Sequence, residues 1–326
     1  MRVVRIREHG GPEVLQLDER PDPELSPGHV RIRVHAAGVN RADLLQRMGL
    51  YPAPPGAPSD VPGLEYAGEV VELGAGAKRF VVGDRVYGIV GGGAYADQVV
   101  VHEREAAHVP EGLSWVQAAS VPEAFATAWD ALTTRGGVQP GSRVLIHAVG
   151  SGVGTAALQL ARALGCHVTG TSRTPDKLER AGELGMLEGV VSVDLGVMRS
   201  ELLRIAPDGF DVIIDLVGGA FVAENIAVVA TLGRIVLVGL TAGIRAEIDL
   251  ARLLNRRATL VGTTLRARPI EEKILVAKEL DRSVGRLFAD KRLRPVIETA
   301  MPLAEAARAH ELVASNKTFG KVVLEV

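Results

Sequence analysis

Apolar and polar residues alternate along the first 120 residues or so, in short stretches that Gly and Pro separate. The alternation is clearest at positions 30–34, 68–73 and 84–88. A period of two with turn residues between the stretches is typical of antiparallel strands that bury one face. Five prolines between positions 52 and 62 predict a loop there, because proline lacks a backbone donor and restricts the residue before it. Such a loop could cover a cleft.

From about residue 122 the pattern changes to continuous apolar runs, each followed by a stretch with helical periodicity. The runs occupy residues 143–148, 167–172, 210–216, 234–239 and 259–264. Unbroken apolar strands are buried on both faces, as in a parallel sheet covered by helices. We therefore predict an α/β fold with a doubly wound parallel sheet in this part of the chain.

The earlier pattern returns after Pro295, where a short strand, a helix over about 302–315 and a last strand over 321–326 are expected. The parallel sheet is therefore predicted to be an insertion. We expect residues 123–295 to form this inserted domain. Residues 1–122 and 296–326 are expected to form one mainly antiparallel β domain around it.

Composition narrows the partners of the protein. The 37 basic and 39 acidic residues leave a net charge of −2, which gives no general attraction for nucleic acid or an anionic membrane. We therefore expect a small-molecule substrate. The single cysteine, Cys166, excludes an internal disulfide and a cysteine-rich metal site. No signal-peptide pattern and no apolar run of transmembrane length is present, so a cytoplasmic protein is expected.

A glycine-rich turn connects the first apolar run, 143–148, to a helix rich in Ala and Leu over 155–164. Its small residues are Gly150, Ser151, Gly152 and Gly154. Small residues at such a junction let the backbone approach a pyrophosphate, and the helix N-terminus offers unpaired N–H groups to its charge. The strict G-x-G-x-x-G spacing is not met, and a turn that serves only packing is the alternative. The position between strand and helix favours a dinucleotide site.

The end of the second apolar run decides which nicotinamide coenzyme is expected. An acidic residue at this point would hold the ribose 2′-hydroxyl of NAD, but the chain has Ser172. Arg173 follows, and Lys177 lies in the first turn of the next predicted helix. A hydroxyl and two cations suit a 2′-phosphate, so we infer NADPH. The alternative is that Arg173 and Lys177 merely solvate the start of a helix.

Several motifs give the chain a family resemblance from end to end. They are Gly38-Val39-Asn40-Arg41-Ala42-Asp43, Pro62-Gly63-Leu64-Glu65, Gly83-Asp84-Arg85-Val86, Ser151-Gly152-Val153-Gly154 and Gly320-Lys321-Val322-Val323-Leu324-Glu325. With them the chain resembles the medium-chain dehydrogenases/reductases, and within these the zinc-free NADPH:quinone oxidoreductase (zeta-crystallin-like) branch. Phrases such as Pro122-Glu123-Ala124 look most like the tumour-suppressor-inducible subgroup. The resemblance implies a Rossmann sheet inserted in a GroES-like catalytic domain, and a homodimer paired through the edge strand around 258–265.

The resemblance also implies site residues. It places Asn40 and Tyr51 toward the nicotinamide or the acceptor, with Tyr51 as a candidate proton donor. From the residues alone, Asn40 could instead stabilise a turn, and Tyr51 could be a surface aromatic. Glu65 is expected to make a structural hydrogen bond. The residues that the resemblance places against the cofactor are Thr127, Ser151, Gly152, Val153, Gly154, Leu240, Thr241, Thr264 and Leu265.

The same superfamily contains zinc alcohol dehydrogenases, and the chain departs from them at the ligand positions. Asn40 stands where they carry a ligand cysteine, and Leu64 where they carry a ligand histidine. Neither side chain replaces a thiolate or imidazole ligand of zinc. We therefore expect no metal. Alcohol oxidation needs a Lewis acid to stabilise an alkoxide, whereas an electron-poor quinone accepts hydride directly.

Two other functions remain open on the sequence. An enone or enoyl-thioester reductase would use the same scaffold, because it too adds hydride to a conjugated system. A protein that binds the nucleotide without turnover is the second alternative. Asn40 and Tyr51 argue against binding alone, and the leading hypothesis is an NADPH-dependent quinone reductase.

Overall fold

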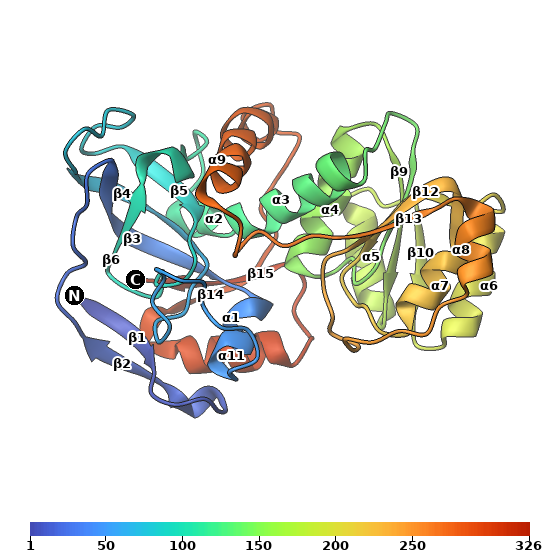
Figure 1. Cartoon of the computed structure of the whole chain (residues 1–326), viewed down its shortest axis with the longest axis horizontal. Helices are drawn as coiled ribbons and strands as arrows, with labels where there is room; N and C mark the ends of the chain where they lie inside the picture. The colour runs from blue at the N-terminus through green and yellow to red at the C-terminus, as the bar shows by residue number, and fades with distance from the viewer. The chain divides into compact units, whose positions relative to one another are not determined.

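The computed structural model describes residues 1–326, and these pack into two compact units (Figure 1). The first unit comprises residues 1–126 and 265–326, and the second comprises residues 127–264. The second unit is therefore inserted between two parts of the first. No helix combines the length and the apolar composition needed to cross a membrane.

A seven-stranded sheet forms the frame of the first unit. Its order is β14 (Ile297–Pro302), β15 (Lys321–Glu325), β3 (His29–Val39), β4 (Glu65–Leu73), β5 (Arg85–Ile89) and β7 (Ala106–His108), and β6 (Gln98–His102) also pairs with β3. All pairs are antiparallel except β14 with β15. A separate antiparallel pair consists of β1 (Arg2–Ile6) and β2 (Leu15–Glu19). The alternating residues Val30, Ile32 and Val34 of β3 are buried, as the period of two predicts.

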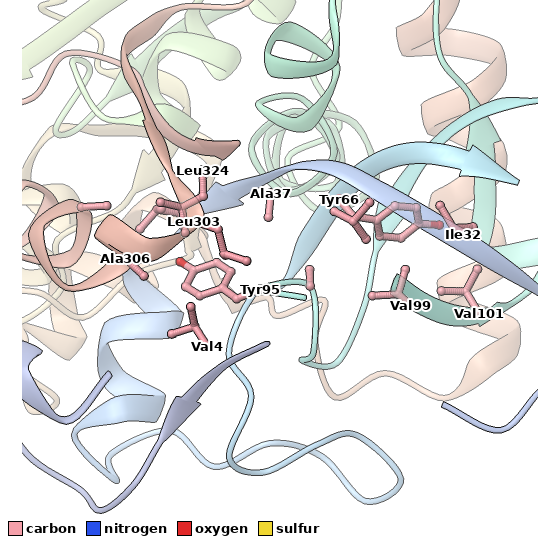
Figure 2. Packing of buried hydrophobic residues seen from close by; sticks show 14 of the residues in the cluster. Val4, Ile32, Ala37, Tyr66, Tyr95, Val99, Val101, Leu303, Ala306 and Leu324 are labelled. Atoms are coloured by element: carbon pink, nitrogen blue, oxygen red, sulfur yellow. The ribbon is translucent and has the colours of Figure 1, made fainter. Parts of the chain in front are cut away.

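Helices and one-turn segments cover this sheet. The helices are α1 (Arg41–Arg47), α2 (Trp115–Ala119), α3 (Pro122–Trp129, which continues into the second unit), α9 (Ile270–Glu279), α10 (Gly285–Ala289) and α11 (Ala306–Ala314). Short turns of helix lie at Pro12–Val14, Glu103–Glu105, Leu280–Val284 and Leu303–Glu305. Figure 2 shows the core between β3 and α11, where Val4, Tyr95, Leu303 and Leu324 pack together. The proline-rich segment from 51 to 64 contains no helix or strand, as predicted.

Residues 265–295 pack with the first unit, whereas the sequence analysis assigned them to the inserted domain. Their contacts explain the difference. Arg104 and Arg79 form ion pairs of 3.0 Å with Glu271 and Asp281, respectively. The ring of Phe288 lies against that of Phe125, with 5.0 Å between the ring centres. The segment is therefore held to the antiparallel domain by both charged and aromatic contacts.

The second unit is a six-stranded parallel sheet. Its order is β10 (Glu188–Val191), β9 (His167–Ser172), β8 (Arg143–Ile146), β11 (Phe210–Asp215), β12 (Val229–Leu237) and β13 (Thr259–Gly262). In chain order this is 3-2-1-4-5-6, the doubly wound arrangement of dinucleotide-binding sheets. The helices between the strands are α4 (Gly152–Ala163), α5 (Pro175–Glu183), α6 (Leu195–Ile205), α7 (Phe221–Val228) and α8 (Leu250–Arg256), after a helical turn at Asp130–Arg135. The predicted fold class is confirmed.

Helix α4 shows how local sequence defines the start and end of these elements. The Ser151 hydroxyl caps its first turn by accepting a hydrogen bond of 3.0 Å from the Gly154 N–H. Gly165 lies just beyond its last turn with φ +81°, a conformation that glycine adopts without strain. The apolar face between these ends is buried, including Ala157 and Leu160. The helix begins at Gly152, one short turn after β8 ends at Ile146.

Candidate active site

Most residues that were expected to bind the cofactor lie at one edge of the parallel sheet. Ser151–Gly154 follow β8, Ser172 ends β9, Leu240 and Thr241 follow β12, and Thr264 follows β13. Because the strands are parallel and paired in register, their carboxyl ends meet at this edge. Ligands of doubly wound sheets bind outside the carboxyl ends of the strands. The structure thus brings these residues together within the second unit.

The turn after β8 has the features of an anion site. The N–H groups of Gly152 and Val153, in the first turn of α4, have no carbonyl partner within the helix. A side chain at Gly154 would lie 2.5 Å from the Ala148 carbonyl oxygen, so glycine is required there for the helix to approach the strand. Ala148 itself has φ +49°. This geometry supports an anion at the start of α4.

The residues expected to discriminate between the coenzymes lie at the end of β9, the strand next to β8. Ser172 is buried, and its hydroxyl accepts a hydrogen bond of 3.3 Å from the Thr174 N–H. Arg173 is exposed, and Lys177 lies half-buried in the first turn of α5. No carboxylate occupies the end of β9. The two cations and the hydroxyl therefore remain candidates for a 2′-phosphate.

A network of buried hydrogen bonds joins the residues just after β8 and β11. His147 follows β8, and its ring nitrogens lie 2.8 Å from the Thr171 hydroxyl and 2.7 Å from the Asn225 amide oxygen. Asn225 donates to Asp215, whose other carboxylate oxygen accepts from the N–H groups of Val217 and Gly218. Burial lowers the pKa of His147, so the ring is neutral. The network fixes the loops after β8 and β11.

Two other residues expected at the cofactor, Thr127 and Leu265, do not directly follow a strand of the parallel sheet. Thr127 is buried within α3, at the first position of the second unit. Leu265 is buried in the first unit, where it lines a small cavity with Ile89 and Glu105. Two residues before Leu265, the Thr263 hydroxyl donates to the Asp130 carboxylate at 2.6 Å. The roles of Thr127 and Leu265 toward a cofactor remain predictions.

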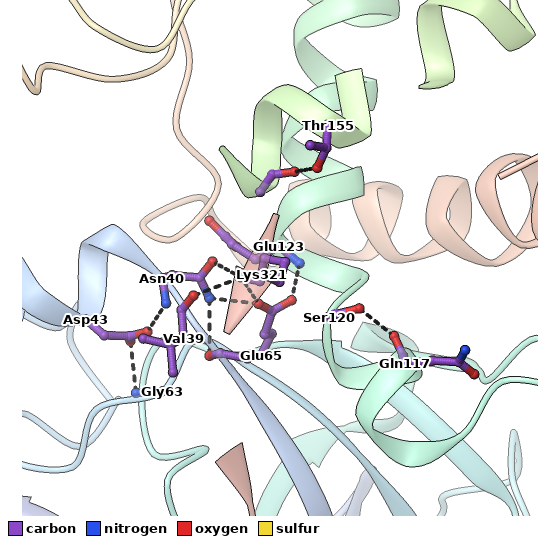
Figure 3. A network of polar contacts seen from close by, with 12 residues as sticks. Val39, Asn40, Asp43, Gly63, Glu65, Gln117, Ser120, Glu123, Thr155 and Lys321 are labelled. Carbon is purple, nitrogen blue, oxygen red and sulfur yellow. Dashed lines mark hydrogen bonds and ion pairs between the residues drawn. The ribbon is translucent and has the colours of Figure 1, made fainter. Parts of the chain in front are cut away.

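In the first unit Asn40 belongs to a buried ionic cluster (Figure 3). The Lys321 ammonium lies 2.6 Å from Glu65 Oε1 and 2.6 Å from Asn40 Oδ1, and it also donates to the Val39 carbonyl at 3.0 Å. Asn40 Nδ2 donates to Glu65 Oε1 at 2.8 Å. Glu65 is fully buried, and its second oxygen accepts from the Glu123 N–H at 2.8 Å. The structural hydrogen bond expected of Glu65 is confirmed.

The same cluster extends along α1 to Asp43. Its carboxylate accepts from the N–H groups of Asn40 at 2.8 Å and Gly63 at 3.0 Å. Tyr95 bonds the carboxylate at 3.4 Å, and its hydroxyl lies 3.2 Å from His310 Nε2. Burial raises the pKa of Asp43 to about 6 and lowers that of His310 to about 3. The amide of Asn40 is thus held on both sides, its oxygen by Lys321 and its nitrogen by Glu65.

Tyr51 opens the proline-rich loop and packs against a buried cation. The Arg266 guanidinium lies 5.1 Å from the centre of the Tyr51 ring and donates to the Tyr51 carbonyl at 3.1 Å. Arg266 also donates to the Gly91 carbonyl at 2.8 Å and to the Gln46 side chain. The loop is therefore anchored where its aromatic residue lies.

Sequence reasoning did not assign a site role to Lys321, Arg266 or Glu123. Lysine in a short terminal strand usually faces solvent, so the strand pattern around Lys321 does not indicate that this side chain is buried. Glu123 and Lys321 did occur in the motifs that carry the family resemblance. For Glu123, the only local indication of a special role was its position directly after a proline at the start of a helix.

Two family models match different parts of the chain. Residues 26–111 match the alcohol dehydrogenase GroES-like domain, and residues 152–280 match the zinc-binding dehydrogenase family. A quinone oxidoreductase of Pseudomonas aeruginosa is 35% identical over 98% of each chain, and the human quinone oxidoreductase is 31% identical over 99% of this chain and 97% of its own. The protein belongs to the medium-chain dehydrogenases/reductases. Within this superfamily it is a member of the quinone oxidoreductase branch.

Other similar proteins have different names. A polyketide synthase of Streptomyces halstedii is 35% identical over 93% of this chain, which spans only 5% of that protein's length. Among solved structures, Escherichia coli quinone oxidoreductase complexed with NADPH has a TM-score of 0.88 and 27% identity, and both chains are fully covered. An NAD-dependent alcohol dehydrogenase has a TM-score of 0.87 and 32% identity, again over both whole chains. Members of this scaffold thus differ in coenzyme and substrate.

The residues of this dehydrogenase/reductase do not fit a catalytic zinc ion. The Asn40 amide is bonded to Lys321 and Glu65, and Leu64 is buried and apolar. No group of three His, Cys, Asp or Glu side chains could hold a metal. The cation beside the Glu65 carboxylate is instead the ammonium group of Lys321.

Proposed function

We propose that the protein reduces quinones with NADPH, by direct hydride transfer and without zinc. The single observation that carries this proposal is the edge of the parallel sheet, where the first turn of α4 follows β8 and the neighbouring β9 ends in Ser172 and Arg173 without a carboxylate. The names of the similar quinone oxidoreductases support the acceptor, and the NADPH complex of the E. coli protein supports the coenzyme.

The residues of the second unit would hold the cofactor as follows. The first turn of α4, from Ser151 to Gly154, binds the pyrophosphate through its N–H groups. Arg173 and Lys177 bind the 2′-phosphate, which makes charge-assisted hydrogen bonds with both. Leu240, Thr241 and Thr264 hold the nicotinamide end. When bound, NADPH supplies a hydride to the acceptor.

The residues of the first unit act on the acceptor. Tyr51 donates a hydrogen bond to its carbonyl oxygen, and the Arg266 charge beside the ring favours the negative charge that develops there. Asn40, held by Lys321 and Glu65, positions the acceptor. Because a reduced quinone spreads its charge over a conjugated ring, these donors suffice without a Lewis acid, and catalysis is mainly positioning.

An enone or enoyl-thioester reductase is the second candidate. The observation in its favour is the match to a segment of a polyketide synthase, which shows this scaffold in a protein not named for quinones. An enone also has a carbonyl oxygen next to a conjugated double bond. The donors proposed for a quinone would therefore serve an enone as well.

Anaerobic stopped-flow mixing with NADPH and a panel of ortho-quinones, para-quinones and enones tests the function. We expect rapid NADPH oxidation with quinones, unchanged after dialysis against a chelator and after Zn²⁺ addition. Faster oxidation by enones would replace the proposal by the second candidate. NADPH binding without oxidation by any acceptor would indicate a binding protein, and activity lost to the chelator and restored by Zn²⁺ would overturn the zinc-free mechanism.

We further propose a homodimer paired through β13. This edge strand bonds only β12, and exposed apolar side chains lie on it and on other segments of the second unit: Ile244, Leu250, Leu254 and Leu260. A second copy would satisfy the open strand edge and cover these side chains. We expect sedimentation at micromolar concentration to give twice 34.5 kDa, and Leu260→Asp to give the monomer. A monomeric wild type would contradict the proposal.

A further inference from the structure

One carboxyl oxygen of Glu123, a residue of the Asn40 cluster, is buried without a hydrogen-bond partner. Glu123 is the second residue of α3, and its backbone N–H bonds Glu65 at 2.8 Å (Figure 3). Its Oε2 is enclosed by protein and makes no hydrogen bond. An enclosed oxygen without a donor cannot carry a full negative charge without a large loss of solvation.

Both cations near Glu123 are already bonded to other groups, so neither pairs with a Glu123 carboxylate. The facing groups are Glu65 on β4, Asp43 on α1, Lys321 on β15 and Arg266. The three donors of the Lys321 ammonium already bond Glu65, Asn40 and Val39. Hydrogen bonds likewise commit Arg266 to backbone carbonyls and the Gln46 side chain.

The carboxyl group is therefore neutral under ordinary conditions. Burial and the nearby Glu65 charge raise the pKa of Glu123 to about 8, and Lys321 offsets this only in part. Since the cluster also holds Asn40, the chain keeps a removable proton next to the residue that positions the acceptor.

We propose that Glu123 is the proton source for the reduction. This role rests on the proposed function. The acceptor gains a hydride, and with it two electrons, from the nicotinamide, which is oxidised. The Glu123 O–H bond then breaks and an O–H bond forms on the reduced quinone, or a C–H bond on a reduced enone. The carboxylate that remains takes a proton from water before the next cycle, so each turnover consumes one hydride and one proton.

The protonation state is tested first, by a measurement that needs no activity. Between about pH 4.5 and pH 8 the folded protein retains the Glu123 proton while the unfolded chain releases it, so this group lowers stability as pH rises through that range. Glu123→Gln removes the effect. Its Tm relative to wild type should therefore increase from pH 5 to about pH 8 and level off above that. A difference in Tm that stays constant with pH would mean that Glu123 is ionised, and would overturn the proposal.

The pH profile of kcat with the best acceptor then tests proton supply. In wild type kcat should fall on the alkaline side as Glu123 loses its proton. Glu123→Gln should lower kcat at pH 7 by about 10²-fold, the low end for a general acid, and should abolish this alkaline fall. Glu123→Asp should keep an alkaline fall, displaced in pH, and thus distinguishes a titrating acid from a merely structural side chain.

Two further variants separate the alternatives. Glu105→Gln removes another partly buried carboxyl whose pKa burial raises, but outside the cluster, and it should leave the kcat profile unchanged. If Tyr51→Phe abolishes the alkaline fall while Glu123→Gln keeps it, Tyr51 is the donor and the proposal is wrong. If wild type reduces no acceptor, the proposed function fails and the proton-source role falls with it, whereas the Tm measurement still reports whether Glu123 holds its proton.

Discussion

Lys321→Met should lower the stability of the first unit by roughly 3–5 kcal/mol, the usual cost of removing one partner from a buried ion pair. Lys321 and Glu65 expose 5% and 0% of their side chains and lie 2.6 Å apart. The variant leaves the Glu65 carboxylate buried with only neutral donors. For a unit of this size the loss corresponds to a Tm lower by about 10 °C, which scanning calorimetry measures.

Two companion variants identify the cause of that loss. Lys321→Met combined with Glu65→Gln should recover most of the stability, because no charge is then left unpaired. Lys317→Met removes an exposed lysine from the same terminal segment and should change stability by less than about 0.5 kcal/mol. If Lys321→Met melts at the wild-type temperature, the ion pair does not stabilise the unit.

Arg173→Ala should weaken NADPH far more than NADH. A hydrogen bond to a charged group contributes about 1.5–3 kcal/mol, so the KM for NADPH should rise roughly 10- to 100-fold while that for NADH stays nearly constant. Arg173 is exposed at the end of β9, and its loss should leave the fold intact. Steady-state kinetics with both coenzymes gives the ratio, and direct titration of coenzyme binding confirms that the effect is on affinity.

Arg180→Ala is the matched control, because Arg180 is exposed near the other end of α5. It should change neither KM appreciably. An equal loss for both coenzymes in Arg173→Ala would show that Arg173 does not read the 2′-phosphate. Selectivity would then need another source.

The parallel sheet was predictable because unbroken apolar runs have few other interpretations. The runs at 143–148 and 167–172 correspond closely to β8 and β9, whereas β12 starts earlier than the run at 234–239 because its pairing with β11 contains a bulge. Residues 265–295 were assigned to the other domain for a different reason. Helix α9 shows which of its faces is apolar, but not which sheet that face will cover.

The candidate site was predictable only where the chemistry is local. Ser151 lies in the turn after β8, Ser172 ends β9 and Arg173 follows it, so their position at the edge of the sheet follows from strand order. The ionic cluster could not be found in this way. Glu65 and Lys321 are 256 positions apart, and neither residue type in its own strand indicates a buried partner. The pKa of Glu123 is raised by burial and by Glu65, which is distant in the sequence, so the residues next to Glu123 give little indication of it.

The bond between Thr263 and Asp130 has a consequence for the order of folding. It joins the point where the chain enters the second unit to the point where it leaves. For the first unit, contact between Glu65 and Lys321 closes a loop of 256 positions, whose entropic cost grows with its effective length. Once the inserted sheet has folded, the bond between Asp130 and Thr263 holds the two ends of the second unit together. The loop between Glu65 and Lys321 is then effectively much shorter. The antiparallel domain should therefore assemble faster after the nucleotide-binding fold than before it.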